Sequence, residues 1–318
     1  MYYSKKTTSI VFIFLFFSTV LSAQDKYTIV IHGGAGNINK EMPDSVKQNY
    51  YNSLKEALVI GKSILHGGGS SLDAVEKVIN YLEDNPLFNA GKGAVYTAEG
   101  KHELDASIMN GKDLSCGAVA GVTTIKNPIS LARLVMEKSQ HVLFFGDGAE
   151  QFGKKMGVAF VNNSFFDTEE RFEQLKKAEE KIKGTVGCVA IDKNGNIAAG
   201  TSTGGMTNKM HGRIGDSPII GAGNYANNTT CGVSATGTGE LFIRNNVAFN
   251  ISALMEYKGF TLQQAAEEMI NKRLPKGAGG IIAVDKNGNY SFVFSTTGMF
   301  RAAANSNGVF EVKYGMIN

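Results

Sequence analysis

The sequence predicts an α+β protein in which two packed β-sheets are covered by helices on their outer faces. Two observations carry this prediction. A pattern of apolar strand, Asn-Gly turn and apolar strand occurs twice, around residues 191–196 (IDKNGN) and 284–289 (VDKNGN), and it is a strong hairpin signal. The strands are apolar at successive positions, as in sheets that are covered on both faces.

The first half of the chain is predicted to combine strands with amphipathic helices. A buried strand over residues 27–32 runs into the small residues GGAG. Apolar side chains then recur at three- and four-residue steps over 54–65 and 72–82, which predicts two helices broken by the glycines at 67–69. The other elements expected here are short strands around Val95, Ile108 and Val119, a helix beginning near Pro128, a strand over 142–145 and a short helix after it.

A charged segment over residues 168–183 separates the two halves. Glu, Lys and Arg follow one another closely in it, so we expect a solvated helical linker. Strand character resumes at Gly184-Thr185, where the first hairpin begins. Two helical stretches, over 240–257 and 262–272, lie between the hairpins and can cover the second sheet.

The first 23 residues are predicted to be a secretory signal peptide. Lys5 and Lys6 precede an apolar run over 10–21, which is too short for a stable membrane span, and Ser22-Ala23 offers a cleavage point. The alternative, a buried N-terminal helix, is disfavoured because the segment lacks an amphipathic period. We therefore expect an exported, periplasmic or secreted protein that starts near Gln24 and has no membrane segment after the signal is removed.

Charge and cysteine content exclude several classes of protein. Without the leader, 30 basic side chains stand against 29 acidic ones, so nucleic acid is not an expected partner. The three cysteines, Cys116, Cys188 and Cys231, are odd in number and widely spaced, which argues against a disulfide framework and a zinc site. The histidines at 32, 66, 102 and 141 also lack metal-ligand spacing, and most of them are expected to be structural.

Glycine-rich segments do not form a nucleotide site. Gly61-Lys62-Ser63 has Glu56 where a phosphate-binding loop needs its first glycine, and residues 32–37 lack the third glycine of the dinucleotide fingerprint. The segment Gly237-Thr238-Gly239 leads into a helix and is either an anion site or a tight turn.

The segment 200–204 (GTSTG) matches the nucleophile elbow of serine hydrolases, but its context does not. No helical period follows it, and His211 precedes Asp216, whereas that motif needs an acid and then a histidine. A serine-hydrolase triad is therefore rejected.

Arg213 and Asp216 lie three residues apart in a glycine-rich loop. The guanidinium can hold an α-carboxylate through two parallel hydrogen bonds while the aspartate takes an α-ammonium, so the pair suits an amino acid. The alternative is an ion pair between the two side chains themselves. Thr185 by itself is an ordinary strand residue, but it follows Gly184 at the end of the charged linker, where a chain can be cut.

Five motifs together resemble the plant-type asparaginase/isoaspartyl peptidase family of N-terminal-nucleophile hydrolases. The resemblance covers nearly all of the chain after the leader, and the five motifs occur in the family's order. They are 89–91 (NAG), 184–187 (GTVG), 201–209 (TSTGGMTNK), 212–218 (GRIGDSP) and 236–240 (TGTGE).

The resemblance implies a four-layer αββα sandwich and a precursor that is cut between Gly184 and Thr185. The resulting chains are residues 24–184 and 185–318, which form one domain and assemble as a homodimer of two-chain units. The implied activity is hydrolysis of β-aspartyl dipeptides and L-asparagine, with release of L-aspartate and without a catalytic cofactor.

The resemblance also implies residue roles. Thr185 is the nucleophile, Thr203 tunes its hydroxyl, and Asn89 lies close to the site. Thr236 and the backbone of Gly237 form the oxyanion hole. The implied substrate-binding set is Arg213, Ile214, Gly215, Asp216, Thr236, Gly237, Thr238 and Gly239. A loop that can hold a structural sodium ion through backbone carbonyls comprises Leu82, Glu83, Asn85, Phe88, Ala90 and Lys92.

General chemistry agrees with a threonine nucleophile. A free α-amine has a pKa of roughly 7.7–8.0, so the amine that cleavage creates at Thr185 can act as its own base. The β-branch restricts χ1 and helps to hold Oγ towards the substrate.

Two alternatives remain. Glycosylasparaginases share the sandwich and the nucleophile, but Gly184, not Asp, precedes Thr185 here, and the 204–209 and 236–239 segments resemble the asparaginase branch. The other alternative is an uncleaved, inactive precursor that serves as a binding or structural protein.

Overall fold

The computed structural model of the chain describes residues 1–3, 26–36, 42–177 and 182–315. The predicted signal peptide, apart from its first three residues, and residues 178–181 of the predicted linker lie outside the described residues. Within the described ranges, no helix combines the length and apolar character that crossing a membrane requires.

The described residues form two sheets, and the larger one contains the predicted first hairpin in its middle. Its neighbouring strands are antiparallel except for β3 and β4, which are parallel. Among the described residues, the order across the sheet is β13 (Phe310–Lys313), β12 (Gly298–Asn305), β1 (Thr28–Gly36), β6 (Thr185–Ile191), β7 (Ile197–Thr203), β2 (Leu104–Asn110), β3 (Cys116–Val122) and β4 (Leu143–Phe145), and β5 (Ile182–Lys183) pairs with β1.

The smaller sheet contains the predicted second hairpin and is antiparallel throughout. Its order is β11 (Tyr290–Phe294), β10 (Gly279–Asp285), β9 (Cys231–Gly237) and β8 (Asn224–Ala226). A cluster of buried apolar side chains that includes Val30, Val189, Ile282 and Val284 lies between the two sheets. The prediction of an α+β protein with two packed sheets is confirmed.

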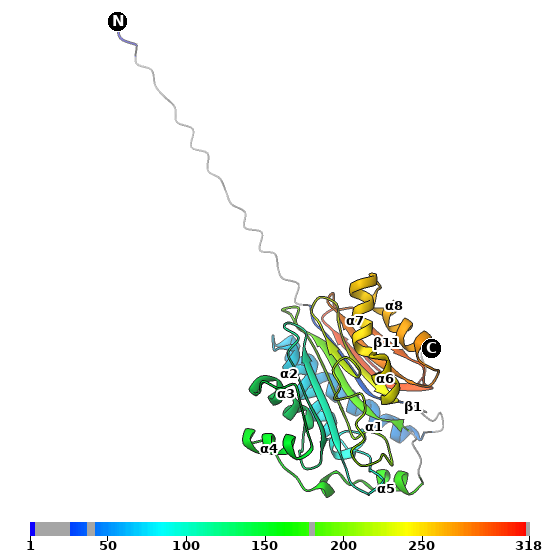
Figure 1. The fold of residues 1–318 in the computed structure, drawn as a ribbon. Coiled ribbons are helices and arrows are strands. Elements are labelled where there is room, and N and C mark those ends of the chain that lie inside the picture. Colours follow the sequence, from blue (N-terminus) through cyan, green and yellow to red (C-terminus); the bar gives the residue numbers. More distant parts are fainter. Residues whose placement is uncertain (4–25, 37–41, 178–181, 316–318) are drawn as a thin grey trace.

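Helices cover the outer face of each sheet (Figure 1). On the larger sheet, α1 (Asp44–His66), α2 (Ser71–Glu83) and α3 (Pro128–Lys138) enclose one apolar core. On the smaller sheet, α6 (Gly239–Asn245), α7 (Val247–Lys258), α8 (Leu262–Glu267) and the π-helical turn η3 (Glu268–Arg273) enclose another. The remaining helical elements are η1 (Gly91–Gly93), α4 (Gly146–Met156), η2 (Asn163–Phe166) and α5 (Glu169–Lys176).

Local sequence signals explain several element boundaries. The break between α1 and α2 falls at the predicted glycines, where Gly68 has a φ of +84°. The side chain of Ser70 then caps α2 by accepting a 3.1 Å hydrogen bond from the N–H of Asp73. Pro128 begins α3, as predicted, because a missing N–H costs nothing in the first turn.

The strand predicted around Val95 is wrong. Val95 follows η1 in an irregular segment, its N–H donates to Asn89 Oδ1 at 2.9 Å, and its carbonyl accepts from His102 Nδ1 at 3.1 Å. Side chains thus satisfy the backbone groups that a neighbouring strand would otherwise bind.

Two helix predictions need correction. The stretch 240–257 is two helices, because Asn246 adopts a φ of +45° between α6 and α7, and Asn tolerates this conformation better than most residues. The charged linker is not solvated throughout. Arg171 of α5 is buried and donates to the carbonyls of Gly93 at 2.8 Å and Leu87 at 3.2 Å.

Candidate active site

Thr185 opens β6 in the centre of the larger sheet, directly opposite Thr203 of β7. Its hydroxyl donates to Thr203 Oγ1 at 3.2 Å, and both residues are buried. Gly184 precedes it against Asn89, and a Cβ at position 184 would lie 2.8 Å from Asn89 Cβ. The predicted cleavage point therefore has no room for a larger residue before the threonine.

Asn89 and Thr203 fix the turn that follows β7. Asn89 Nδ2 donates to the carbonyl of Gly205 at 2.7 Å, and Thr203 Oγ1 accepts from the N–H of Gly205 at 3.0 Å. The N–H of Gly204 donates to the Asn89 carbonyl at 3.1 Å. Asn89 thus lies near Thr185, as predicted, and its hydrogen bonds hold the turn that follows Thr203.

His32, one of the four histidines of which most were expected to be structural, contacts Thr185. Its Nδ1 lies 2.8 Å from the Thr185 carbonyl oxygen, so Nδ1 carries the proton because a carbonyl only accepts. Nε2 then accepts from Ser234 Oγ at 2.9 Å, and Ser234 Oγ lies 2.7 Å from Thr201 Oγ1. Burial lowers the pKa of His32 to about 3, so the ring is neutral.

This buried chain of hydrogen bonds joins the two sheets, and it depends on a glycine that leaves space for it. A Cβ at Gly187 would lie 2.0 Å from Ser234 Oγ and 2.3 Å from His32 Nε2, so only glycine admits both side chains. Sequence analysis missed Ser234 and the contact of His32, because no local pattern links strands so far apart in the chain.

A pocket collects most of the residues predicted for cleavage, catalysis and substrate binding. Three residues of the predicted substrate-binding set, Ile214, Thr236 and Thr238, do not line the pocket but are adjacent in sequence to residues that do. Of these, Ile214 is exposed. Gly205, Met206 and Ser217 were not predicted. The residues that line the pocket are Gly184, Thr185, Thr203, Gly205, Met206, Arg213, Gly215, Asp216, Ser217, Gly237 and Gly239.

The two charged residues of this pocket are not paired with each other. Arg213 Nε donates to Glu240 Oε1 at 2.9 Å, and Arg213 Nη2 donates to Glu240 Oε2 at 3.0 Å. Asp216 is buried, and its Oδ2 has no hydrogen-bond partner among the described residues. Of the two interpretations of this loop, an ion pair between Arg213 and Asp216 is therefore wrong.

Burial raises the pKa of Asp216 to about 7. The positive charge of Arg213 counteracts this rise, while the negative charges of Glu240 and Asp105 add to it. A buried carboxylate oxygen without a hydrogen-bond partner suits a cation, such as the α-ammonium of an amino acid.

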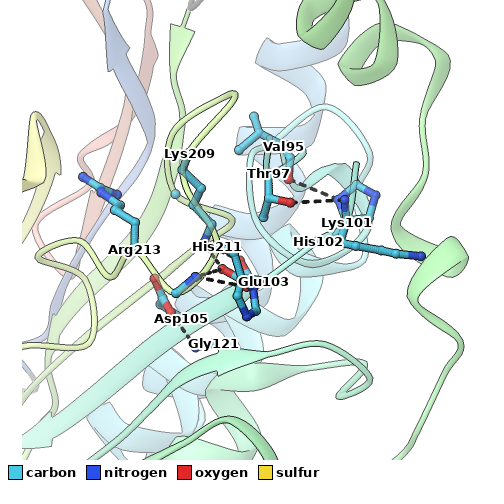
Figure 2. Close-up of polar contacts among 12 residues, drawn as sticks. Val95, Thr97, Lys101, His102, Glu103, Asp105, Gly121, Lys209, His211 and Arg213 are labelled. Carbon is cyan, nitrogen blue, oxygen red and sulfur yellow. Dashed lines mark hydrogen bonds and ion pairs between the residues drawn. The ribbon is translucent and has the colours of Figure 1, made fainter. Parts of the chain in front are cut away.

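A second polar cluster anchors the loop that carries Arg213 and Asp216 (Figure 2). Lys209 Nζ donates to the Glu103 carbonyl at 2.9 Å, His211 Nδ1 contacts the Glu103 carboxylate, and the N–H of Gly212 donates to Glu103 Oε2 at 3.2 Å. Sequence analysis did not identify Glu103 or Lys209 as partners of the loop, and their spacing in the chain gives no such signal.

The predicted sodium loop connects α2 to η1. Gly91, with a φ of +52°, faces the carbonyl of Glu83, from which a Cβ would be 2.3 Å away, and a Cβ at Gly93 would lie 2.2 Å from the Phe88 carbonyl. Backbone oxygens therefore crowd the inside of this loop, and oxygen is the ligand that hard cations prefer. Lys92 Nζ contacts the Phe165 carbonyl, and the carbonyls of Leu82 and Ala90 accept backbone hydrogen bonds.

The carboxyl group of Glu83 points elsewhere. It accepts from Ser202 Oγ at 2.7 Å and from the N–H of Ile129 at 3.0 Å, so it joins α2 to β7 and to the start of α3. Burial raises the pKa of Glu83 to about 8, and its hydrogen-bond donors counteract the rise.

Comparison with known proteins shows which family the chain resembles. A protein-family model described as asparaginase matches residues 25–314. The isoaspartyl peptidase of Salmonella typhimurium is 50% identical over 297 residues, which cover 87% of this chain and 95% of that protein. The isoaspartyl peptidase of Escherichia coli is 48% identical over 296 residues, with 87% and 92% covered. The human isoaspartyl peptidase/L-asparaginase is 44% identical over 289 residues, with 87% and 92% covered.

A family model that spans nearly the whole chain and relatives of this identity and coverage agree with the five motifs and with the pocket around Thr185. The chain belongs to the asparaginase family.

Proposed function

We propose that this chain is an isoaspartyl peptidase/L-asparaginase that hydrolyses β-aspartyl dipeptides and L-asparagine and releases L-aspartate. One observation carries the proposal. Thr185 begins a strand, its hydroxyl contacts Thr203, and it lines the same pocket as Arg213 and Asp216. The similarity to curated isoaspartyl peptidases supports the substrate class. The two packed sheets with outer helices support the four-layer sandwich of N-terminal-nucleophile hydrolases.

The first reaction in this proposal is cleavage of the chain by itself. Thr185 Oγ attacks the Gly184 carbonyl carbon, the acyl group moves from nitrogen to oxygen, and water hydrolyses the resulting ester. The products are residues 24–184, which end in a carboxylate, and residues 185–318, which begin with a free amine. Because Gly184 lines the pocket, its separation from Thr185 also opens space beside the nucleophile.

In the second reaction the same hydroxyl attacks the substrate. The new α-amine of Thr185, with an ordinary pKa of roughly 7.7–8.0, takes the proton from Oγ. The hydroxyl of Thr236 and the N–H of Gly237 stabilise the oxyanion. Ammonia or the amino component of the dipeptide leaves with a proton, and water then hydrolyses the acyl-enzyme to release aspartate.

Arg213 and Asp216 bind the two α-substituents of the substrate. The guanidinium pairs with the α-carboxylate, and Asp216 pairs with the α-ammonium. Ile214, Gly215, Thr238 and Gly239 complete the surrounding backbone. No step requires a cofactor.

Three further features belong to the proposal. The carbonyl-lined loop after α2 would hold a structural sodium ion, which supplies rigidity and no chemistry. Two cleaved units assemble as a homodimer. The first 23 residues direct export to the periplasm or the medium and are then removed, as the apolar run at 10–21 behind two lysines suggests.

Gel electrophoresis under denaturing conditions tests the proposal directly. Purified protein should run as two fragments, and N-terminal sequencing of the smaller should begin Thr-Val-Gly-Cys-Val. Thr185→Ala should stay whole and should not hydrolyse asparagine, because both reactions need the hydroxyl, whereas Thr185→Ser should retain some cleavage. A single uncut chain with full activity would refute the mechanism.

A further inference from the structure

Arg213 and Asp216 carry opposite charges in the same loop, yet they do not pair. A Cβ at Gly239 would lie 3.0 Å from both Arg213 Nη2 and Asp216 Oδ1, so the two groups border the same small space. A half-buried guanidinium and a buried carboxylate this close normally pair, because a buried carboxylate oxygen without a partner is unfavourable. Some other group must hold the guanidinium away from Asp216.

Glu240, at the start of α6, is that group. A guanidinium offers two edges to a carboxylate, a side edge formed by Nε and Nη2 and an end edge formed by Nη1 and Nη2. Glu240 occupies the side edge, with distances of 2.9 Å from Nε and 3.0 Å from Nη2. The end edge remains beside the glycines of the pocket, since a Cβ at Gly215 would lie 2.9 Å from Arg213 Nη1.

We propose that Glu240 is a positioning residue for substrate recognition. It holds Arg213 by the side edge, so that the end edge takes the substrate's α-carboxylate and Asp216 stays available for the α-ammonium. This inference rests on the proposed function, because it assigns a substrate with both groups to the pocket. Glu240 itself pairs with Arg213 and is not among the residues that line the pocket around Thr185.

The opposite role for the same contact makes a different prediction. If Glu240 occupied the place of the substrate carboxylate, asparagine would have to displace it, and removal of Glu240 would lower KM. If Glu240 positions Arg213, its removal lets the guanidinium turn towards Asp216, and both substrate contacts weaken together. The sign of the change in KM therefore separates the two roles.

The test uses the cleaved enzyme with Glu240→Ala and Glu240→Gln. KM for asparagine should rise about tenfold or more in Glu240→Ala, because misplacement of a binding group by about 1 Å is costly, with a smaller rise in Glu240→Gln and less change in kcat. Self-cleavage should continue, since the Gly184–Thr185 bond presents no α-carboxylate. Glu268→Ala is the matched control, because Glu268 pairs with Arg273 at 3.4 Å in the same helical layer, away from the pocket. It should leave KM unchanged.

Two analogues sharpen the result. KM should rise in Glu240→Ala for succinamate, which lacks the α-ammonium, and for β-alaninamide, which lacks the α-carboxylate. In an Asp216→Ala background, the carboxylate towards which Arg213 would turn is absent. Adding Glu240→Ala should therefore raise KM for succinamate much less than it does in the wild-type enzyme. This non-additivity would not arise from general loss of structure.

A lower or unchanged KM for asparagine in Glu240→Ala would overturn the inference, and so would loss of self-cleavage or fully additive effects of the two substitutions. Failure of the proposed function looks different. In that case the wild-type chain itself remains uncut or does not hydrolyse asparagine, whatever residue stands at position 240.

Discussion

Two hairpins in this molecule share the same turn and differ at their open ends. In β6–β7, Asp192 Oδ1 accepts from the N–H groups of Asn194 and Asn196 at 2.9 and 3.0 Å. In β10–β11, Asp285 Oδ1 accepts from those of Asn287 and Asn289 at 2.8 and 2.9 Å. In both turns the glycine has a positive φ, +77° at Gly195 and +82° at Gly288.

The strands diverge away from the turn. The first hairpin pairs seven residues on each strand and ends with Thr185 opposite Thr203, whereas the second pairs five and ends with Gly280 opposite Phe294. Thr296 corresponds to Thr203 when both are counted from the turn, but its hydroxyl donates to the Gly298 carbonyl at 3.0 Å. A shared turn therefore determines the hairpin, and the residues at the open end determine whether two threonine hydroxyls meet there.

The largest expected effect comes from matched substitutions at the two open ends. Thr203→Val removes the hydroxyl that lies 3.2 Å from Thr185 Oγ1 and accepts the Gly205 N–H. We expect kcat for asparagine to fall about a hundredfold, within the range for a group that assists proton transfer. Thr296→Val should leave kcat at the wild-type value. Steady-state kinetics with both variants measures the difference.

Thr203→Ser is the control for this pair. It restores the hydroxyl without the methyl group and should recover most of the activity. Similar losses of kcat in Thr203→Val and Thr296→Val, or no loss in Thr203→Val, would show that the Thr203 hydroxyl at the open end of the first hairpin does not assist Thr185.

The pocket at the open end of the first hairpin should also respond to pH. Burial raises the pKa of Asp216 to about 7, so its carboxyl group is increasingly neutral below this pH and loses its attraction for an α-ammonium. We expect kcat/KM for asparagine to fall relative to that for succinamate by about tenfold per unit below pH 7. The ratio would cancel the titration of the proposed free amine of Thr185, which would affect both substrates.

Asp216→Asn should remove the pH dependence of this ratio, because the amide does not titrate. If the ratio for the wild-type enzyme stayed constant from pH 8 to pH 5.5, Asp216 would not be the group that binds the ammonium.

Local signals in the sequence predicted much of the fold. The glycines at 67–69 ended α1, Pro128 began α3, and the two Asn-Gly segments formed hairpins, since each depends on backbone preferences of a few residues. The turns differ from a two-residue Asn-Gly turn. Among the described turn residues only the glycine has a positive φ, and the preceding aspartate side chain closes the loop.

The missed features depend on contacts between distant segments. The spacing of Arg213 and Asp216 suggested that they either share a ligand or pair with each other, but Arg213 pairs with Glu240, which lies on another element. His32 reaches the Thr185 carbonyl across the sheet. Val95 resembles a strand residue, but Asn89 binds its N–H. Tertiary partners of this kind leave no periodic signal.

The smallest expected effect concerns the turns themselves. Both aspartates are buried and both accept two N–H groups of their own turn, but their second oxygens differ. Asp192 Oδ2 accepts from the N–H of Ser71 at the start of α2, at 3.0 Å, whereas Asp285 Oδ2 accepts from Asn289 Nδ2 at 2.9 Å within its own turn. Asp192 thus also joins the first hairpin to a helix.

Replacement by alanine should therefore destabilise the first hairpin more than the second. Either substitution should lower the free energy of unfolding by about 1–2 kcal/mol through the lost turn bonds. Asp192→Ala should cost about 1 kcal/mol more, because it leaves a buried N–H of Ser71 unsatisfied and removes a negative charge from a helix N-terminus. Urea unfolding in the uncut Thr185→Ala background measures both hairpins within one continuous chain. Equal losses would mean that the helix contact contributes nothing, and that the two turns are equivalent in energy as well as in geometry.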